Sequence, residues 1–317
     1  MAAKEAQLQA GRWERVPGLE ILFVLLWNSG FIGAEFGLPH ARPWTLLFWR
    51  YLALAGLLGL LLAVRGRLRW PGWSAAGIAA VVGVLAHAVW LGCVLVALDV
   101  GVPAGIVALV TALQPLVTGA LAGPVLGEHT TARQWLGLVV GFLGVVVAVG
   151  ARLSLDPAPT WGYLLPFGSV LAITAASLLQ RRRERQRVPA RLPGDLALFY
   201  QAAAGTAALL LPAWWLEGFA ADWTPRFVAV MAWLVLAVSL GAYGAMWRLL
   251  AREEATRVAS LFYLSPPVTM AMAWVALGDR LILTDLIGLA VGAVGVLLVY
   301  VGPRSPAEAP SPRGDSS

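Results

Sequence analysis

Long apolar stretches, separated by short polar stretches, run along nearly the whole sequence. A helix needs about 20 mostly apolar residues to cross the hydrocarbon core of a membrane. The pattern predicts ten such spans, at about residues 17–38, 44–63, 75–97, 104–126, 132–150, 161–180, 194–216, 227–248, 256–278 and 283–302. Gly and Pro inside several of them are compatible with lipid-embedded helices, because neighbouring helices satisfy the freed backbone groups. We therefore expect an all-α integral membrane protein with ten transmembrane helices.

The composition supports a chain that is solvated mostly by lipid. Of its 317 residues, 59% are hydrophobic and only 13% are charged. A soluble domain of this length would need charges over most of its surface. The net charge of +6 does not indicate nucleic-acid binding, because the basic residues lie in short loops rather than on one face. The single cysteine, Cys93, excludes an intramolecular disulfide, and the three scattered histidines predict no metal cluster. We expect no cofactor.

Arginine and lysine residues orient the predicted spans. With the N-terminus inside, the cytoplasmic segments hold 18 of these residues and the outer segments hold 4. Because cytoplasmic loops carry the excess of basic residues, both termini should face the cytoplasm. We expect the protein to lie in the plasma or inner membrane. The first apolar stretch also resembles a signal peptide. We expect it to be retained, since cleavage would leave nine spans and break the symmetry described next.

Two fifteen-residue stretches repeat one pattern. QPLVTGALAGPVLGE (114–128) and SPPVTMAMAWVALGD (265–279) are 151 residues apart. The same shift gives 17 identities in 47 positions between residues 104–150 and 255–301 without a gap. The predicted domains are a cytoplasmic N-terminus (1–16), a first five-helix repeat (17–150), a linker (151–160), a second five-helix repeat (161–302) and a disordered, Pro/Ser-rich cytoplasmic tail (303–317). Because five is odd, the second repeat must enter the membrane from the opposite face, which predicts inverted repeats and alternating access.

Several segments resemble one known family. LLWNSGFIGAEFGLP (25–39) and FWRYLALAG (48–56) are similar to the first two helices of the ten-span EamA branch of the drug/metabolite transporter superfamily. The two repeated stretches are similar to its fourth and ninth helices. The resemblance implies export of amino acids or other small metabolites, or movement of drugs or nucleotide sugars. One departure is Glu35, where related chains often carry Lys.

Three ionisable side chains lie well within apolar spans: Glu35, Arg50 and His87. Such residues are costly in a membrane and usually face the interior of the bundle. We expect Glu35 and Arg50 to share an ion pair or a water network, which either ties two spans together or serves substrate or proton. His87 shares a helix face with Trp90, either lining a cavity or bonding a nearby carbonyl.

The repeated stretches centre on proline. Gln114-Pro115 and Ser265-Pro266-Pro267 should kink their helices, because proline removes a backbone N–H and clashes with the preceding turn. The kinks serve either gating and cavity contacts or packing alone. The candidate substrate-binding residues are therefore Trp27, Asn28, Glu35, Arg50, His87, Trp90, Gln114, Tyr243, Tyr263 and Ser265.

Two sets of glycines form small-residue stripes, Gly137, Gly141 and Gly144 with their copies Gly288, Gly292 and Gly295. Small residues let helix backbones approach closely, so the stripes indicate either packing within the chain or a homodimer surface.

The sequence predicts a secondary transporter for a small organic metabolite, an amino acid or similar compound, working as an exporter. A polyspecific drug exporter is the alternative. A membrane enzyme is less favoured because no catalytic motif or metal cluster occurs. A channel is less favoured because no filter motif is evident. The expected partners are a small-molecule substrate and the lipid bilayer.

Overall fold

A computed structural model describes residues 17–127, 132–152, 158–185, 192–251, 258 and 261–300. The predicted N-terminal segment (1–16) and tail (303–317) lie outside this part of the chain. Within it every element is helical, and the one extended pairing is a bridge between Ala41 and Ala221 that joins two loops.

Eight helical elements make up the first part of the chain. They are α2 (Pro17–Gly37), α3 (Pro43–Val64), α4 (Trp73–Gly83), the π-helical segment η1 (Val84–Val89), α5 (Trp90–Asp99), α6 (Ala104–Thr111), α7 (Gln114–Leu126) and α8 (Ala132–Arg152). The segments α4, η1 and α5 follow one another without a gap and form one continuous span. The helices α6 and α7 are separated by a two-residue turn and also belong to one span.

Nine more elements follow. They are the short 3₁₀ turn η2 (Thr160–Leu164), α9 (Leu165–Arg185), α10 (Gly194–Glu217), α11 (Pro225–Ala232), the π-helical segment η3 (Trp233–Ala242), α12 (Tyr243–Leu250), the 3₁₀ turn η4 (Leu261–Leu264), α14 (Ser265–Leu277) and α15 (Leu283–Tyr300). Here α11, η3 and α12 form one continuous span.

Within the described residues, eight helical stretches are long and apolar enough to cross a membrane. They correspond to the first eight predicted spans. The last two predicted spans contain shorter apolar helices, Leu261–Leu277 and Leu283–Leu298. Large apolar side chains cover the outside of the bundle, among them Leu60, Trp215 and Val275, each more than 60% exposed. Soluble monomers rarely expose such a large apolar surface to water, whereas a lipid bilayer solvates it. The chain is therefore an integral membrane protein.

Positions 151 residues apart share the same irregularities. The π-helical segments η1 and η3 interrupt the third and eighth spans at corresponding places. A break precedes Gln114 in the fourth span and a 3₁₀ turn precedes Ser265 in the ninth. Both of these helices end at a left-handed glycine, Gly127 with φ 70° and Gly278 with φ 74°. Glycine adopts this conformation without steric cost, which is why it ends helices here.

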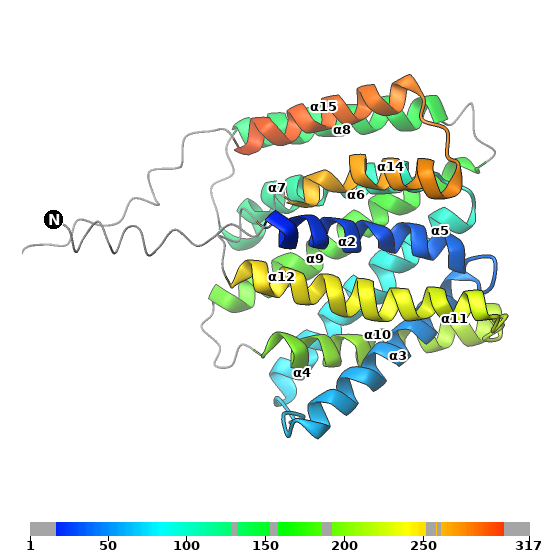
Figure 1. Ribbon diagram of the computed structural model, residues 1–317. Helices are drawn as coiled ribbons and strands as arrows, with labels where there is room; N and C mark the ends of the chain where they lie inside the picture. The colour runs from blue at the N-terminus through cyan, green and yellow to red at the C-terminus, as the bar shows by residue number, and fades with distance from the viewer. Residues whose placement is uncertain are drawn as a thin grey trace, which may run out of the picture.

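The two ends of the bundle are built by helices that correspond in the repeat. Figure 1 shows α8 and α15 side by side at one edge, with α3 and α10 towards the opposite edge. Between them, α2 packs against η3 and α14, and α9 packs against α5 and α7. The first helix of each predicted half therefore contacts the third and fourth predicted spans of the other.

The glycine stripes lie between α8 and α15. A Cβ atom added to Gly144 would lie 2.6 Å from the Gly288 carbonyl oxygen, and one added to Gly295 would lie 2.7 Å from the Gly137 carbonyl oxygen. The 151-residue shift converts each of these contacts into the other, because Gly144 corresponds to Gly295 and Gly137 corresponds to Gly288. Gly141 and Gly292 lie between them, against the backbones of Gly295 and Gly144. The stripes are thus used for close packing inside one chain.

A buried ion pair closes one end of the same helix pair. The Arg152 guanidinium donates from Nη2 to Asp285 Oδ2 at 2.5 Å and from Nε to Asp285 Oδ1 at 3.2 Å. Arg152 Nη2 also donates to the carbonyl oxygen of Arg280 at 2.6 Å. This two-point pairing fixes α8 against the start of α15.

Candidate substrate cavity

A cavity lies inside the bundle between helices of both halves. Its empty volume, including the part open to solvent, is about 520 Å³. The first three spans and the eighth span surround it. The lining residues are Trp27, Gly30, Phe31 and Ala34 from α2, Arg50 and Tyr51 from α3, Trp90, Leu91, Val94 and Leu95 from α5, Val238 from η3 and Tyr243 from α12.

Aromatic side chains form one wall and the floor of this cavity. The Trp27 and Trp90 rings stack with centroids 6.2 Å apart and planes 23° apart, and Tyr243 lies 5.7 Å from Trp27. Trp27, Phe31 and Ala34 recur at helical spacing and so share the face of α2 that borders the cavity. Phe262 meets Trp27 edge-on at 5.0 Å and supports it from behind. The result is a flat, rigid apolar surface.

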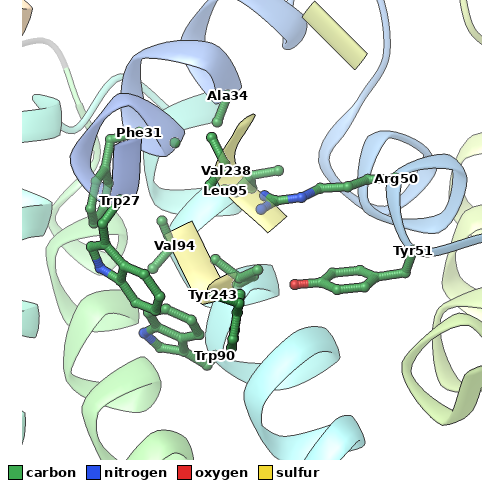
Figure 2. A pocket seen from close by; sticks show the side chains of 12 residues that line it. Trp27, Phe31, Ala34, Arg50, Tyr51, Trp90, Val94, Leu95, Val238 and Tyr243 are labelled. Atoms are coloured by element: carbon green, nitrogen blue, oxygen red, sulfur yellow. The ribbon is translucent and has the colours of Figure 1, made fainter. Parts of the chain in front are cut away.

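Arg50 is the charged residue in the described lining. Its side chain is 5% exposed, and Figure 2 shows it reaching into the cavity from the side opposite Trp27 and Phe31. Its Nε and Nη2 atoms donate to Ser239 Oγ at 3.3 and 3.1 Å. Ser239 Oγ in turn donates to the Leu234 carbonyl oxygen at 2.9 Å, inside the π-helical segment η3. The guanidinium also lies 5.6 Å from the centre of the Tyr51 ring.

Of the two alternatives predicted for Glu35 and Arg50, the ion pair is not present, and a shared water network stays a prediction. Arg50 is paired with Ser239 instead. Glu35 is not among the described lining residues, although its neighbour Ala34 is. Glu35 lies within electrostatic range of Asp99 and Asp279.

His87 lies behind the cavity rather than in its lining. It is buried, and its ring packs against the Tyr51 ring with centroids 4.5 Å apart and planes tilted by 32°. Neither ring nitrogen has a hydrogen-bond partner of good geometry among the described residues, although the Gln201 side chain is nearby. Figure 2 shows the Tyr51 hydroxyl pointing into the cavity. His87 therefore packs against a ring that lines the cavity and helps to hold it in place.

Asn28 lies beside the cavity residue Trp27 but joins two helices. Its Nδ2 donates to the Val24 carbonyl oxygen at 2.7 Å, and its Oδ1 accepts from Thr269 Oγ1 at 3.1 Å. The Nδ2 bond stays within α2, and the Oδ1 bond from Thr269 joins α2 to α14.

Gln114 plays a corresponding part on the other side of the bundle. Its Nε2 donates to Thr118 Oγ1 at 3.0 Å and contacts Ser177 Oγ at 3.4 Å. Thr118 Oγ1 in turn donates to Thr174 Oγ1 at 3.2 Å, which links α7 to α9. Thr118 and Thr269 are 151 residues apart, and each makes a hydrogen bond to the first helix of the opposite half.

The prolines stand where one helical segment ends and another begins. Pro115 lies in the first turn of α7, and Pro266 and Pro267 lie in the first turn of α14. Proline fits the first turn because the missing N–H would have no helical partner there. Ser265 is buried at the same break, and Tyr263 precedes it in η4. None of these residues borders the cavity in the described part of the chain.

The structure thus brings together four of the ten candidates, Trp27, Arg50, Trp90 and Tyr243. Sequence reasoning missed Phe31 and Tyr51 in the lining and Ser239 behind it. The helical spacing from Trp27 could have indicated Phe31. Ser239 carried no such signal, because only the packing of α3 against η3 brings it to Arg50.

Comparison with known sequences identifies the family. The profile of the EamA-like transporter family matches this chain twice, at residues 18–150 and at residues 160–301. The chain belongs to the EamA-like transporter family. The family predicted from the sequence motifs is confirmed, and the EamA-like transporter is a multi-pass protein of the cell membrane.

Curated relatives of this EamA-like transporter are also named as transporters. A "Probable amino-acid metabolite efflux pump" of Salmonella typhimurium is 26% identical over 293 residues, covering 90% of this chain and 95% of the relative. A "Probable terminal-alkyne amino-acid exporter" of Streptantibioticus cattleyicolor is 30% identical over 223 residues, covering 68% of this chain and 71% of the relative. The "Uncharacterized inner membrane transporter YedA" of Escherichia coli K12 is 28% identical over 310 residues, covering 93% and 95%.

A solved structure has the same fold. A chain titled "Crystal structure of protein" superposes with a TM-score of 0.60 at 20% sequence identity, covering 89% of this chain and 96% of that one. The similarity in fold extends over both halves of the EamA-like transporter.

Proposed function

We propose that this EamA-like transporter is a secondary transporter that exports a small organic metabolite, an amino acid or a similar compound. The observation that carries the proposal is the cavity inside the bundle, which is lined by the first three spans and by the eighth span from the other half. A cavity shared by both halves can change its access when the halves move relative to one another.

Alternating access rests on two inverted five-helix repeats with both termini in the cytoplasm. Support for the repeats comes from the paired π-helical segments, the paired breaks before Gln114 and Ser265, and the exchanged contacts of Gly144 and Gly295. In this arrangement the shorter helices Leu261–Leu277 and Leu283–Leu298 are parts of the ninth and tenth spans.

The lining suits a small amphipathic solute. The lining is mostly apolar and aromatic with a few polar groups, which is typical of a small-molecule site. One cation, two tyrosines and two stacked indoles could hold one polar end and one flat apolar body. The names of two relatives, an amino-acid metabolite efflux pump and an amino-acid exporter, point to the same class of solute.

A polyspecific drug exporter is the second candidate. It is favoured by the mostly apolar and aromatic lining, which would accept many shapes. The two candidates differ in the ligand range: a metabolite exporter should saturate with a narrow set of related solutes, whereas a drug exporter should be inhibited by unrelated hydrophobic cations.

Counterflow in proteoliposomes tests the proposal. Vesicles loaded with unlabelled amino acids should accumulate the matching labelled compound transiently and saturably. Leu91→Trp should abolish this counterflow, because the larger side chain fills the cavity that Leu91 borders. Leu52→Trp is the matched control, since Leu52 is exposed on the outside of α3. Linear, unsaturable flux would indicate a channel and contradict the proposal, as would full activity of Leu91→Trp.

A further inference from the structure

Arg50 is a buried cation that faces a cavity without a carboxylate partner in the described part of the chain. The ion pairs there join Arg67 to Asp195 and Arg152 to Asp285. Among the described residues, the neutral Ser239 oxygen is the hydrogen-bond acceptor of Arg50. A guanidinium has five N–H donors, so most of its donor capacity is not used by Ser239.

Such an arrangement is costly unless a ligand completes it. Removing a guanidinium from water carries a penalty that a single neutral hydroxyl does not offset. Arginine presents a planar fork of N–H groups that matches the two oxygens of a carboxylate. Because the free donors are held at the cavity by Ser239 and by the Tyr51 ring, the missing partner is an anionic group that enters the cavity.

The rest of the cavity defines what is attached to that anion. Figure 2 shows Arg50 and Tyr51 entering from one side, with Trp27 and Phe31 on the opposite side. The stacked indoles of Trp27 and Trp90 offer a flat apolar surface there. A ligand that spans the cavity would place its acid at Arg50 and a flat apolar body against the indoles.

We propose that Arg50 is the carboxylate receptor of the cavity, so that the substrates are small organic acids with a flat apolar body, amino acids included. This inference rests on the proposed transport function of the same site. No Asp or Glu lies among the described lining residues, so the carboxylate of the ligand is required while an amino group is not. The Arg50 charge also repels an amine, which disfavours cationic drugs as substrates.

Three probes of one shape test this without any mutation. They are phenylalanine, 3-phenylpropionate, which lacks the amino group, and 2-phenylethylamine, which lacks the carboxylate. Binding is measured on the full-length protein in lipid nanodiscs by tryptophan fluorescence, since Trp27 and Trp90 line the cavity. The acid and the amino acid should bind within about tenfold of one another, and the amine at least about 30-fold more weakly, which corresponds to about 2 kcal/mol for a lost charge pair.

Variants of Arg50 provide the second arm. Arg50→Gln should weaken binding of 3-phenylpropionate at least about 30-fold, and Arg50→Lys by less, because Lys keeps the charge but loses the fork. The matched control is Arg226→Gln, since the Arg226 guanidinium also lies over a ring, that of Phe36 at 5.3 Å, but its side chain is exposed. It should leave the affinity within about twofold of wild type.

The outcomes separate this inference from the proposed function. An amine that binds as tightly as the acid, absence of binding by all three probes, or an unchanged acid affinity in folded Arg50→Gln overturns the carboxylate receptor. Should Arg50→Gln fail to fold, the three probes on the wild-type protein still decide. Saturable counterflow of neutral or cationic solutes that acids do not inhibit would overturn the receptor and leave transport intact. Absence of saturable counterflow with any organic solute would refute the proposed function itself.

Discussion

Replacing Gly144 by alanine should destabilise the contact between α8 and α15. The added Cβ atom would lie 2.6 Å from the Gly288 carbonyl oxygen and 2.7 Å from the Gly292 amide nitrogen. Both are backbone atoms of a helix, so they cannot rotate away, and the two helices must separate by a few tenths of an ångström. Overpacking of this kind costs about 1–3 kcal/mol.

The control for this variant is Gly150→Ala on the same helix. Nothing lies within 4 Å of a Cβ atom at Gly150. Alanine is favoured over glycine in a helix by up to about 1 kcal/mol, and this gain applies to both variants. The difference between them therefore isolates the helix contact, and Gly144→Ala should be less stable than Gly150→Ala by about 1–3 kcal/mol.

The assay can use the single cysteine of the chain. Cys93 is partly buried, so a thiol-reactive fluorescent dye reports unfolding as the thiol becomes exposed on heating. The Tm of Gly144→Ala should lie at least about 2 °C below that of Gly150→Ala. Equal Tm values, or a higher value for Gly144→Ala, would refute close packing of these helices as the role of the glycine stripe.

Four further variants test contacts between helices and the limits of the cavity. Thr269→Val should lower the stability by about 1–3 kcal/mol in the same dye assay, because it leaves the buried Asn28 Oδ1 without its donor; an unchanged Tm would contradict this. Arg152→Gln alone should lower the free energy of unfolding by about 3–5 kcal/mol, because it leaves Asp285 as a buried unpaired charge. The double variant Arg152→Met with Asp285→Leu should recover most of this loss of stability. A double variant as unstable as the single one would contradict this account. Glu35→Gln should leave the affinity for 3-phenylpropionate within about twofold, because Glu35 does not line the cavity. A large loss of affinity would place it in the site.

Hydrophobic pattern was sufficient to locate the helices, because lipid requires each span to be apolar over a defined length. It also located the breaks before Gln114 and Ser265, since proline acts on its own helix and needs no tertiary information. Among the described residues, the ninth and tenth predicted spans contain the apolar helices Leu261–Leu277 and Leu283–Leu298.

The partners of polar side chains were the part that the pattern could not supply. Asn28 and Gln114 look like ligand-binding groups in the sequence, yet their amides join helices. Arg50 has Ser239 beside it rather than Glu35, which depends on how η3 is placed against α3. A single position along a helix changes the direction of a side chain by about 100°, so a pairing predicted from depth in the membrane alone fails easily.

The central claim is that the two proposed halves move relative to one another and open the cavity alternately to the two sides of the membrane. Spin labels at two pairs of positions in a Cys93→Ala background measure this, one pair at Asp99 and Val228 near the outer ends and one at Trp73 and Leu250 near the inner ends; all four side chains are exposed. Each pair should show two distance populations by double electron–electron resonance. Adding substrate or changing lipid conditions should lengthen the outer distance in the same fraction of molecules in which the inner distance shortens. Distances that lengthen together, or an outer distance that changes while the inner distance stays fixed, would contradict alternating access.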